Sequence, residues 1–258
     1  MTYRILLNII FIFLCLHSFS QEKLNPERPS ESKTPELVKG NNLQIEAGLK
    51  KERVTEHQYE YNHPELLVRY GLFNALELRM EMVSQTTKDN VTKENLSGLI
   101  PVYFGVKAKI LPEYKWLPSI GASADIGVPS LASSDYSIDG IPFQFRTLFN
   151  NNITSKFSVQ YNVGVAWNET NNQKDNKQWM YSFNPTYEIT DNFHVFVEEY
   201  AFLRNGTGAE HYFDGGLQYF FNKDLVVDVS GGVGLSNNSS DYFVKGGFAY
   251  RISFSGKN

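Results

Sequence analysis

The residues best able to do chemistry in this sequence are charged side chains that alternate with apolar ones. In the segment 76–82, Glu77, Arg79 and Glu81 alternate with leucine and methionine. Residues two apart in a β-strand share a face, so this spacing gives one charged face and one apolar face. The same reasoning applied along the chain puts further charges on the polar face: Arg69, Glu77, Arg79, Glu81, Lys107, Lys109, Arg146, Glu188, Asp214, Asp228, Lys245 and Arg251.

Two kinds of chemistry suit such a face if it lines the inside of a closed barrel. Charges of both signs compensate one another away from bulk water, which favours ion pairs that brace the wall. The alternative is a polar path that selects solutes by charge and size. About twelve strands enclose a modest lumen that side chains or the N-terminal segment can largely fill, and this geometry favours bracing over an open pore.

Catalytic and metal chemistry finds little support in the sequence. A barrel lipase needs a histidine beside a serine and an acid or amide. After residue 20 the histidines are His57, His63, His194 and His211, and the sequence places no such partners beside them. No zinc or iron spacing and no glycine-rich phosphate loop is present. We therefore expect no enzyme, no cofactor and no metal site.

The elements that must position these charges are strands. From Leu43 almost to the end the apolar period is two, most clearly over 157–167 and 225–235, and no segment has a 3.6-residue stripe. About twelve such segments occur, each near the ten residues that a tilted membrane strand needs. The sequence predicts an all-β protein, a single closed antiparallel transmembrane barrel of about twelve strands over 42–254.

Connections of two lengths alternate between the expected strands. The short ones are 70–75, 150–152, 190–192 and 222–224; the long polar ones are 51–62, 85–96, 129–139, 168–177 and 204–210. Outer-membrane barrels have tight periplasmic turns and longer external loops. This alternation predicts the outer membrane, and an even strand number puts both ends of the chain in the periplasm. The proline-bounded link 111–118 breaks the rhythm.

Residues 1–20 are predicted to be a signal peptide. Arg4 precedes an apolar run over 5–16, small residues occupy 18 and 20, and Gln21 becomes the new N-terminus. The single cysteine, Cys15, lies in this segment, and the large residues before it argue against a lipid anchor.

Residues 21–41 have no apolar period and are predicted to form an extended periplasmic arm. In the alternative interpretation the arm turns upward and plugs the lumen, with Arg28 meeting inward carboxylates.

Composition agrees with a membrane barrel and gives no reason to expect a nucleic-acid partner. Aromatic residues make up 14%, which suits strands and membrane interfaces. The formal net charge of -4 provides no basic face for a phosphate backbone. Mean hydropathy is -0.34, as expected when only alternate residues face lipid.

The last strand carries a second signal. Phe248, Tyr250, Ile252 and Phe254 alternate with smaller or polar residues, which resembles the strand that the barrel-assembly machinery recognises. The tail 255–258 departs from that pattern because the phenylalanine usually closes the chain.

Short motifs spread over nearly the whole chain after residue 20 resemble one family. They are Glu27-Arg28-Pro29, Leu37-Val38-Lys39-Gly40 leading into Leu43-Gln44-Ile45-Glu46, Val68-Arg69-Tyr70-Gly71-Leu72 with Leu76-Glu77-Leu78-Arg79, Trp116-Leu117-Pro118, Asp214-Gly215-Gly216-Leu217 and Tyr250-Arg251-Ile252. The sequence resembles the outer-membrane transporters labelled "MetA-pathway of phenol degradation". The resemblance implies a barrel that moves small organic molecules, aromatic or hydrophobic ones among them.

The expected partners are outer-membrane lipid, the barrel-assembly machinery and a small organic solute. A structural or surface-interaction barrel with a closed lumen is the alternative, and a lipid-modifying enzyme is the least favoured one. Two features fit the barrel poorly. Pro185 falls within an expected strand, and Glu198-Glu199 breaks the alternation, so one carboxylate approaches lipid or the strand bulges.

Overall fold

The structure is a computed structural model that describes residues 23–167, 177–204 and 208–254. The predicted signal peptide and the tail 255–258 lie outside the described residues. Within these ranges nearly all regular structure is β-strand, with two single-turn 3-10 helices, η1 (Pro129–Leu131) and η2 (Ser134–Tyr136). In the described part of the chain, no helix is long and apolar enough to cross a membrane.

Thirteen strands occur among the described residues. They are β1 (Asn42–Arg53), β2 (Gln58–Phe73), β3 (Leu76–Asp89), β4 (Asn95–Leu99), β5 (Val102–Leu111), β6 (Ser119–Val128), β7 (Phe143–Asn152), β8 (Phe157–Trp167), β9 (Lys177–Thr190), β10 (Phe193–Arg204), β11 (Gly208–Asn222), β12 (Leu225–Gly234) and β13 (Tyr242–Ser253).

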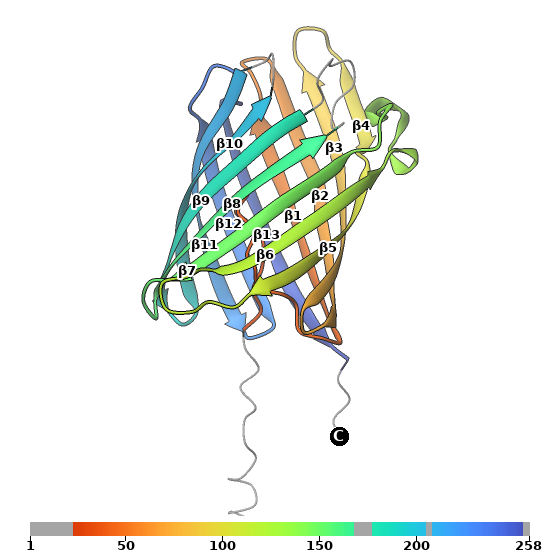
Figure 1. The fold of residues 1–258 in the computed structure, drawn as a ribbon. Coiled ribbons are helices and arrows are strands. Elements are labelled where there is room, and N and C mark those ends of the chain that lie inside the picture. The colour runs from red at the N-terminus through yellow and green to blue at the C-terminus, as the bar shows by residue number, and fades with distance from the viewer. Residues whose placement is uncertain (1–22, 168–176, 205–207, 255–258) are drawn as a thin grey trace, which may run out of the picture.

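Twelve of these strands close into a ring in which every neighbouring pair is antiparallel (Figure 1). The ring is shut by β1 pairing with β13 and by β2 pairing with β3. The short strand β4 stands outside the ring and pairs with the end of β3. The prediction of an all-β, closed antiparallel barrel of about twelve strands is confirmed. We call the end where β1 begins and β13 ends the lower end, as drawn in Figure 1.

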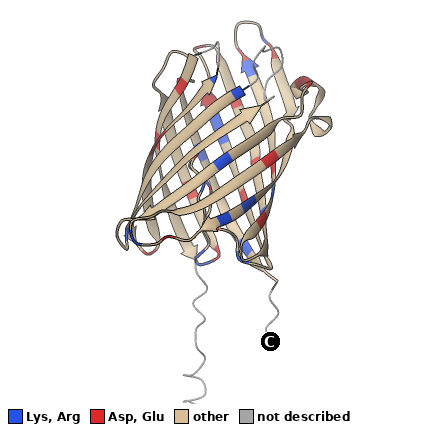
Figure 2. Cartoon of the chain, viewed as in Figure 1, with Lys and Arg blue, Asp and Glu red and all other residues tan. Residues whose placement is uncertain are grey.

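The two faces of the wall differ as the period of two requires. Apolar side chains point outward, and Leu217, Val229 and Phe248 are 42%, 47% and 42% exposed. Inward positions such as Arg69 and Lys107 have no exposed surface, and charged residues occur in strands around the ring (Figure 2). Backbone polar groups in the hydrocarbon core of a membrane must be hydrogen-bonded within the protein. A closed ring of strands meets this requirement because it has no unpaired strand edge. The fold is that of an outer-membrane barrel.

Strand ends differ from the expected boundaries. Polar residues assigned to long loops continue the strands instead: β1 ends at Arg53 and β2 begins at Gln58. The expected turn at 150–152 is also wrong, because β7 runs to Asn152. These strands extend beyond the apolar belt, where hydropathy no longer marks them.

The two misfits have different outcomes. Glu198 points inward and is 1% exposed, whereas Glu199 lies on the outer face with its neighbours Tyr181 and His211, so the strand keeps its alternation. Pro185 sits opposite Val159 in β8 without a bulge, and in the ladder from β9 to β10 neither Pro185 nor its neighbour Asn184 has a partner. Proline has no backbone N–H to donate, and the sheet accommodates this because two residue pairs are absent from the ladder between β9 and β10.

Candidate functional site

Residues 23–41, which we call the arm, lie inside the barrel. At the lower end the Leu24 N–H donates to the Lys223 carbonyl at 2.9 Å, and Leu24 packs against Phe220, Val226 and Ala249. The chain then rises into the lumen and returns to the lower end, where the Asn41 N–H donates to the Gly71 carbonyl at 2.8 Å. The arm is therefore a loop within the lumen, as in the plug alternative, and not an extended segment on the periplasmic side.

Glu27 in this loop is the centre of a buried ion cluster. Its carboxylate accepts two hydrogen bonds from Arg79, at 2.6 and 2.7 Å, and one from Lys107 at 2.8 Å. A guanidinium nitrogen of Arg69 is 3.7 Å away. The paired geometry with Arg79 is the strong, two-pronged form of a carboxylate–guanidinium contact.

Arg69 extends the cluster to two wall carboxylates. It donates to Glu77 at 2.8 and 2.9 Å and to Glu46 at 2.9 Å. Glu46 in turn accepts the backbone N–H groups of Glu27 and Arg28, at 2.9 and 3.0 Å. The wall therefore binds both the charge and the backbone of the arm at this point.

The charge balance around Glu27 fixes its protonation state. Burial alone would raise the pKa of the Glu27 carboxyl, but the charges of Arg79, Lys107 and Arg69 outweigh burial and hold that pKa well below its usual range. Glu27 is therefore a carboxylate at every ordinary pH while the arm is docked.

Arg28 crosses the seam between the first and last strands. Its guanidinium contacts Glu65 at 2.8 Å and Asp228 at 3.5 Å. It lies over the directly paired Gly48 and Gly247, where any β-carbon would overlap it. Glycine at these two positions opens the space that the side chain occupies.

The opposite wall binds the arm mainly through its backbone. Glu198 accepts the N–H groups of Glu31 and Ser32, both at 2.7 Å. The Asn162 amide accepts from the Lys33 N–H at 2.6 Å and donates to the Lys33 carbonyl at 2.9 Å. The Ser32 and Ser182 hydroxyls are 2.7 Å apart.

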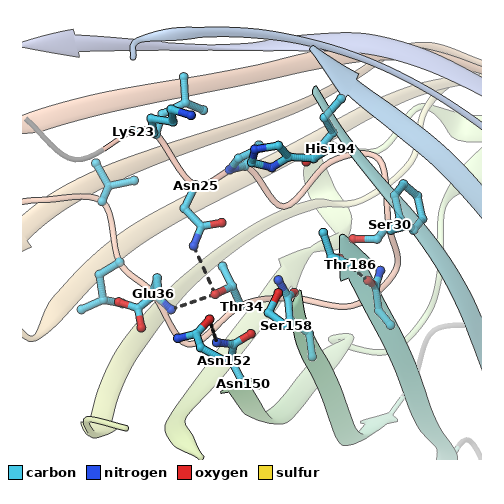
Figure 3. A pocket seen from close by; sticks show the side chains of 18 of the residues that line it. Lys23, Asn25, Ser30, Thr34, Glu36, Asn150, Asn152, Ser158, Thr186 and His194 are labelled. Atoms are coloured by element: carbon cyan, nitrogen blue, oxygen red, sulfur yellow. Dashed lines mark hydrogen bonds between the residues drawn. The ribbon is translucent and has the colours of Figure 1, made fainter. Parts of the chain in front are cut away.

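Cavities lie on both sides of the arm. The lower one, about 530 Å³, is lined by hydroxyl and amide side chains such as Asn150, Ser158 and Thr186 (Figure 3). The upper one, about 240 Å³, lies against Glu81 and Arg146. Ser30 lines both, so the arm is the partition between them.

A family model matches most of this sequence. Residues 27–252 match the model of the family described as "Putative MetA-pathway of phenol degradation". The chain belongs to this family. No curated protein matches the sequence.

Solved structures of low sequence identity are similar to this chain. The KdgM porin in complex with disordered oligogalacturonate is 14% identical, with a TM-score of 0.53 over 80% of this chain and 98% of the porin. The translocator domain of autotransporter NalP from Neisseria meningitidis is 11% identical, with a TM-score of 0.50 over 83% of this chain and 89% of NalP. The Ralstonia pickettii toluene transporter TbuX is 9% identical, with a TM-score of 0.48 over 86% of this chain and 92% of TbuX.

The structure places the predicted charged residues on the lumen face and divides them by partner. Eight contact the arm: Arg69, Glu77, Arg79, Lys107, Lys109, Arg146, Asp228 and Lys245. Four do not: Glu188 lies 3.8 Å from His194, Arg251 pairs with Asp224, Glu81 lines the upper cavity, and buried Asp214 has no hydrogen-bond partner on either oxygen.

Several residues of the site were not predicted from the sequence. Glu198, Asn162 and Ser182 are missing from the predicted set although each is at least nine-tenths buried and binds the arm. The outward alternation of Val195 and Val197 is the signal that assigns Glu198 to the lumen. Asn162 and Ser182 are uncharged, so a search for charges passes over them.

The residues of the predicted assembly signal lie on the outer face of the last strand. Phe248, Tyr250 and Phe254 are 42%, 45% and 60% exposed, and the spacing of two puts Ile252 on the same face; their role in assembly stays a prediction. Among the described residues, no three His, Cys, Asp or Glu side chains come together as a possible metal site.

Proposed function

We propose that this barrel passes small organic solutes across the outer membrane through its lumen, and that the arm is the gate. The observation that supports it is the partition: one polar cavity lies above the arm, another below, and Ser30 borders both. On this proposal residues 1–20 are removed as a signal peptide, and the lower end with both termini faces the periplasm.

The nature of the arm contacts supports a gate more than a permanent seal. Between Glu27 and Lys33 the arm is held by hydrogen bonds and ion pairs to the wall, which water replaces when the arm leaves. The apolar residue Leu24 anchors the arm at the lower end and need not move. A closed, structural barrel is the competing function, and the same contacts would then serve as bracing.

A reversible lock tests the proposal. Ser32→Cys with Ser182→Cys puts two thiols where two hydroxyls are 2.7 Å apart, close enough for a disulfide. We expect conductance in planar bilayers from the reduced protein, silence after oxidation and recovery on reduction. Oxidation of the single variant Ser32→Cys should change nothing.

Two outcomes would contradict the proposal. Equal conductance in the oxidised and reduced double variant would show that solutes bypass the arm. Silence of the folded wild-type and reduced proteins alike would reject transport and favour the closed structural barrel. Gel mobility with and without boiling reports whether each variant has folded.

A further inference from the structure

Two charged side chains of opposite sign line the upper cavity without a partner among its other residues. The arm segment 27–33 forms its floor, and Glu81 of β3, Arg146 of β7 and Lys245 of β13 belong to its walls. It adjoins a second cavity of about 530 Å³ beneath η2, with which it shares Glu81, Val83 and Gln144. A solute entering from the upper end therefore reaches this floor first.

Most charges around the cavity already have partners. Glu27 is paired with Arg79, Glu31 with Arg146 at 2.7 Å, and Arg28 with Glu65 at 2.8 Å. Lys245 donates to the Pro29 carbonyl at 3.3 Å and lies 4.9 Å from the centre of the Phe243 ring. These groups form the frame of the cavity.

Glu81 and Lys33 are the exceptions. Both line the cavity, and within the described residues neither side chain makes a hydrogen bond or an ion pair. Glu81 lines this space from the wall and Lys33 from the arm, so opposite charges border the same cavity. Both side chains are half-buried, so each charged group is open to the cavity and can take a partner there.

We propose that this cavity binds a small zwitterion, with its ammonium group on Glu81 and its carboxylate on Lys33. The inference rests on the proposed passage of solutes through the lumen and names their class. A cavity of about 240 Å³ has room for a short amino acid. A hydrocarbon would leave both charges without partners, so the site disfavours the hydrophobic solutes that the family resemblance suggests.

The bound solute would also act on the arm. Glu81 belongs to the wall and Lys33 to the arm, so a zwitterion between them bridges the two. A ligand that binds only the docked arrangement stabilises it. Binding at this site is therefore expected to lengthen the closed intervals seen in bilayer recordings.

Three probes of equal size test the charge requirement. Pentanoate and 4-aminobutanamide have the same number of non-hydrogen atoms as 4-aminobutanoate, but each lacks one of its two charges. Titration calorimetry of the full mature chain in detergent at pH 7 should show 4-aminobutanoate binding at least about tenfold more tightly than either comparator. Equal binding of pentanoate, or no binding of 4-aminobutanoate, would overturn the proposal.

Two variants test the assignment of residues. Glu81→Gln and Lys33→Gln should each weaken 4-aminobutanoate binding at least about tenfold. Glu188→Gln, which changes a lower-cavity carboxyl, should leave it unchanged. Unchanged binding in a folded Glu81→Gln protein would contradict the site. Because binding is measured without flux, a silent barrel that still binds the probe would refute the gate and leave this site standing.

Discussion

Two walls of the barrel hold the arm by different means. On the side of β2, β3 and β5, the cations Arg69, Arg79 and Lys107 surround the side chain of Glu27. On the side of β8 and β10, Asn162 and Glu198 bind backbone groups of the arm. Binding to the first wall depends mainly on which side chain the arm carries, and binding to the second depends mainly on the path of the arm's backbone. The difference assigns recognition to one wall and alignment to the other.

The largest expected effect comes from removing the shared anion. Glu27→Gln leaves three buried cations without their common partner, which costs about 3–5 kcal/mol of docking free energy for a broken buried pair. The released arm should become about 100-fold more populated or more, seen as longer open intervals in bilayer recordings. Glu36→Gln is the matched control, because the Glu36–Lys109 pair is about a third exposed and contributes little. Equal effects of the two variants would contradict the ranking of the walls.

A smaller effect is expected at the opposite wall. Glu198→Gln replaces a carboxylate that accepts two backbone N–H groups by an amide with one acceptor oxygen, at a cost of about 1–3 kcal/mol. Open intervals should lengthen, but less than for Glu27→Gln. Glu199→Gln, the next residue along and on the outer face, should leave them unchanged. If Glu198→Gln lengthened the open intervals more than Glu27→Gln, the hydrogen bonds to the arm backbone would contribute more to docking than the ion cluster.

The smallest effect is expected from pH between 7 and 5. The charges of Arg79, Lys107 and Arg69 prevail over burial, so the Glu27 pKa is lowered in the docked arm. A lowered pKa stabilises docking fully above the free-carboxyl value of about 4.3, and the stabilisation is lost as pH falls below it. Open intervals should therefore stay constant from pH 7 to 5 and lengthen below about pH 4. A large change between pH 7 and 5 would place the controlling group elsewhere.

The barrel could be predicted because the pattern that produces it is visible within the sequence of each strand. Each strand alternates apolar and polar residues, and Glu77, Arg79 and Glu81 fall on the lumen face as the period of two requires. The ends of the strands could not be predicted in the same way. Residues up to Arg53 stay paired with β13 above the apolar belt, where pairing and not hydropathy holds the strand.

The arm could not be placed by the same reasoning. Its residues have no period, so nothing local distinguishes a solvated segment from one whose polar groups are satisfied by a charged interior. The partners of Glu27 come from β2, β3 and β5, and they meet only when the ring is closed. Only the presence of Arg28 and inward carboxylates suggested the plug, and the structure pairs Arg28 with Glu65 and Asp228.

The route of the arm has a topological consequence for biogenesis. The described arm enters the lumen beside Lys223 and leaves it beside Gly71, both at the lower end. A loop that starts and finishes at one mouth can be inserted or withdrawn after the cylinder is complete, without a free chain end being threaded through it. Strand closure between β1 and β13 can thus precede docking, and the wall can finish folding while its passage is still vacant.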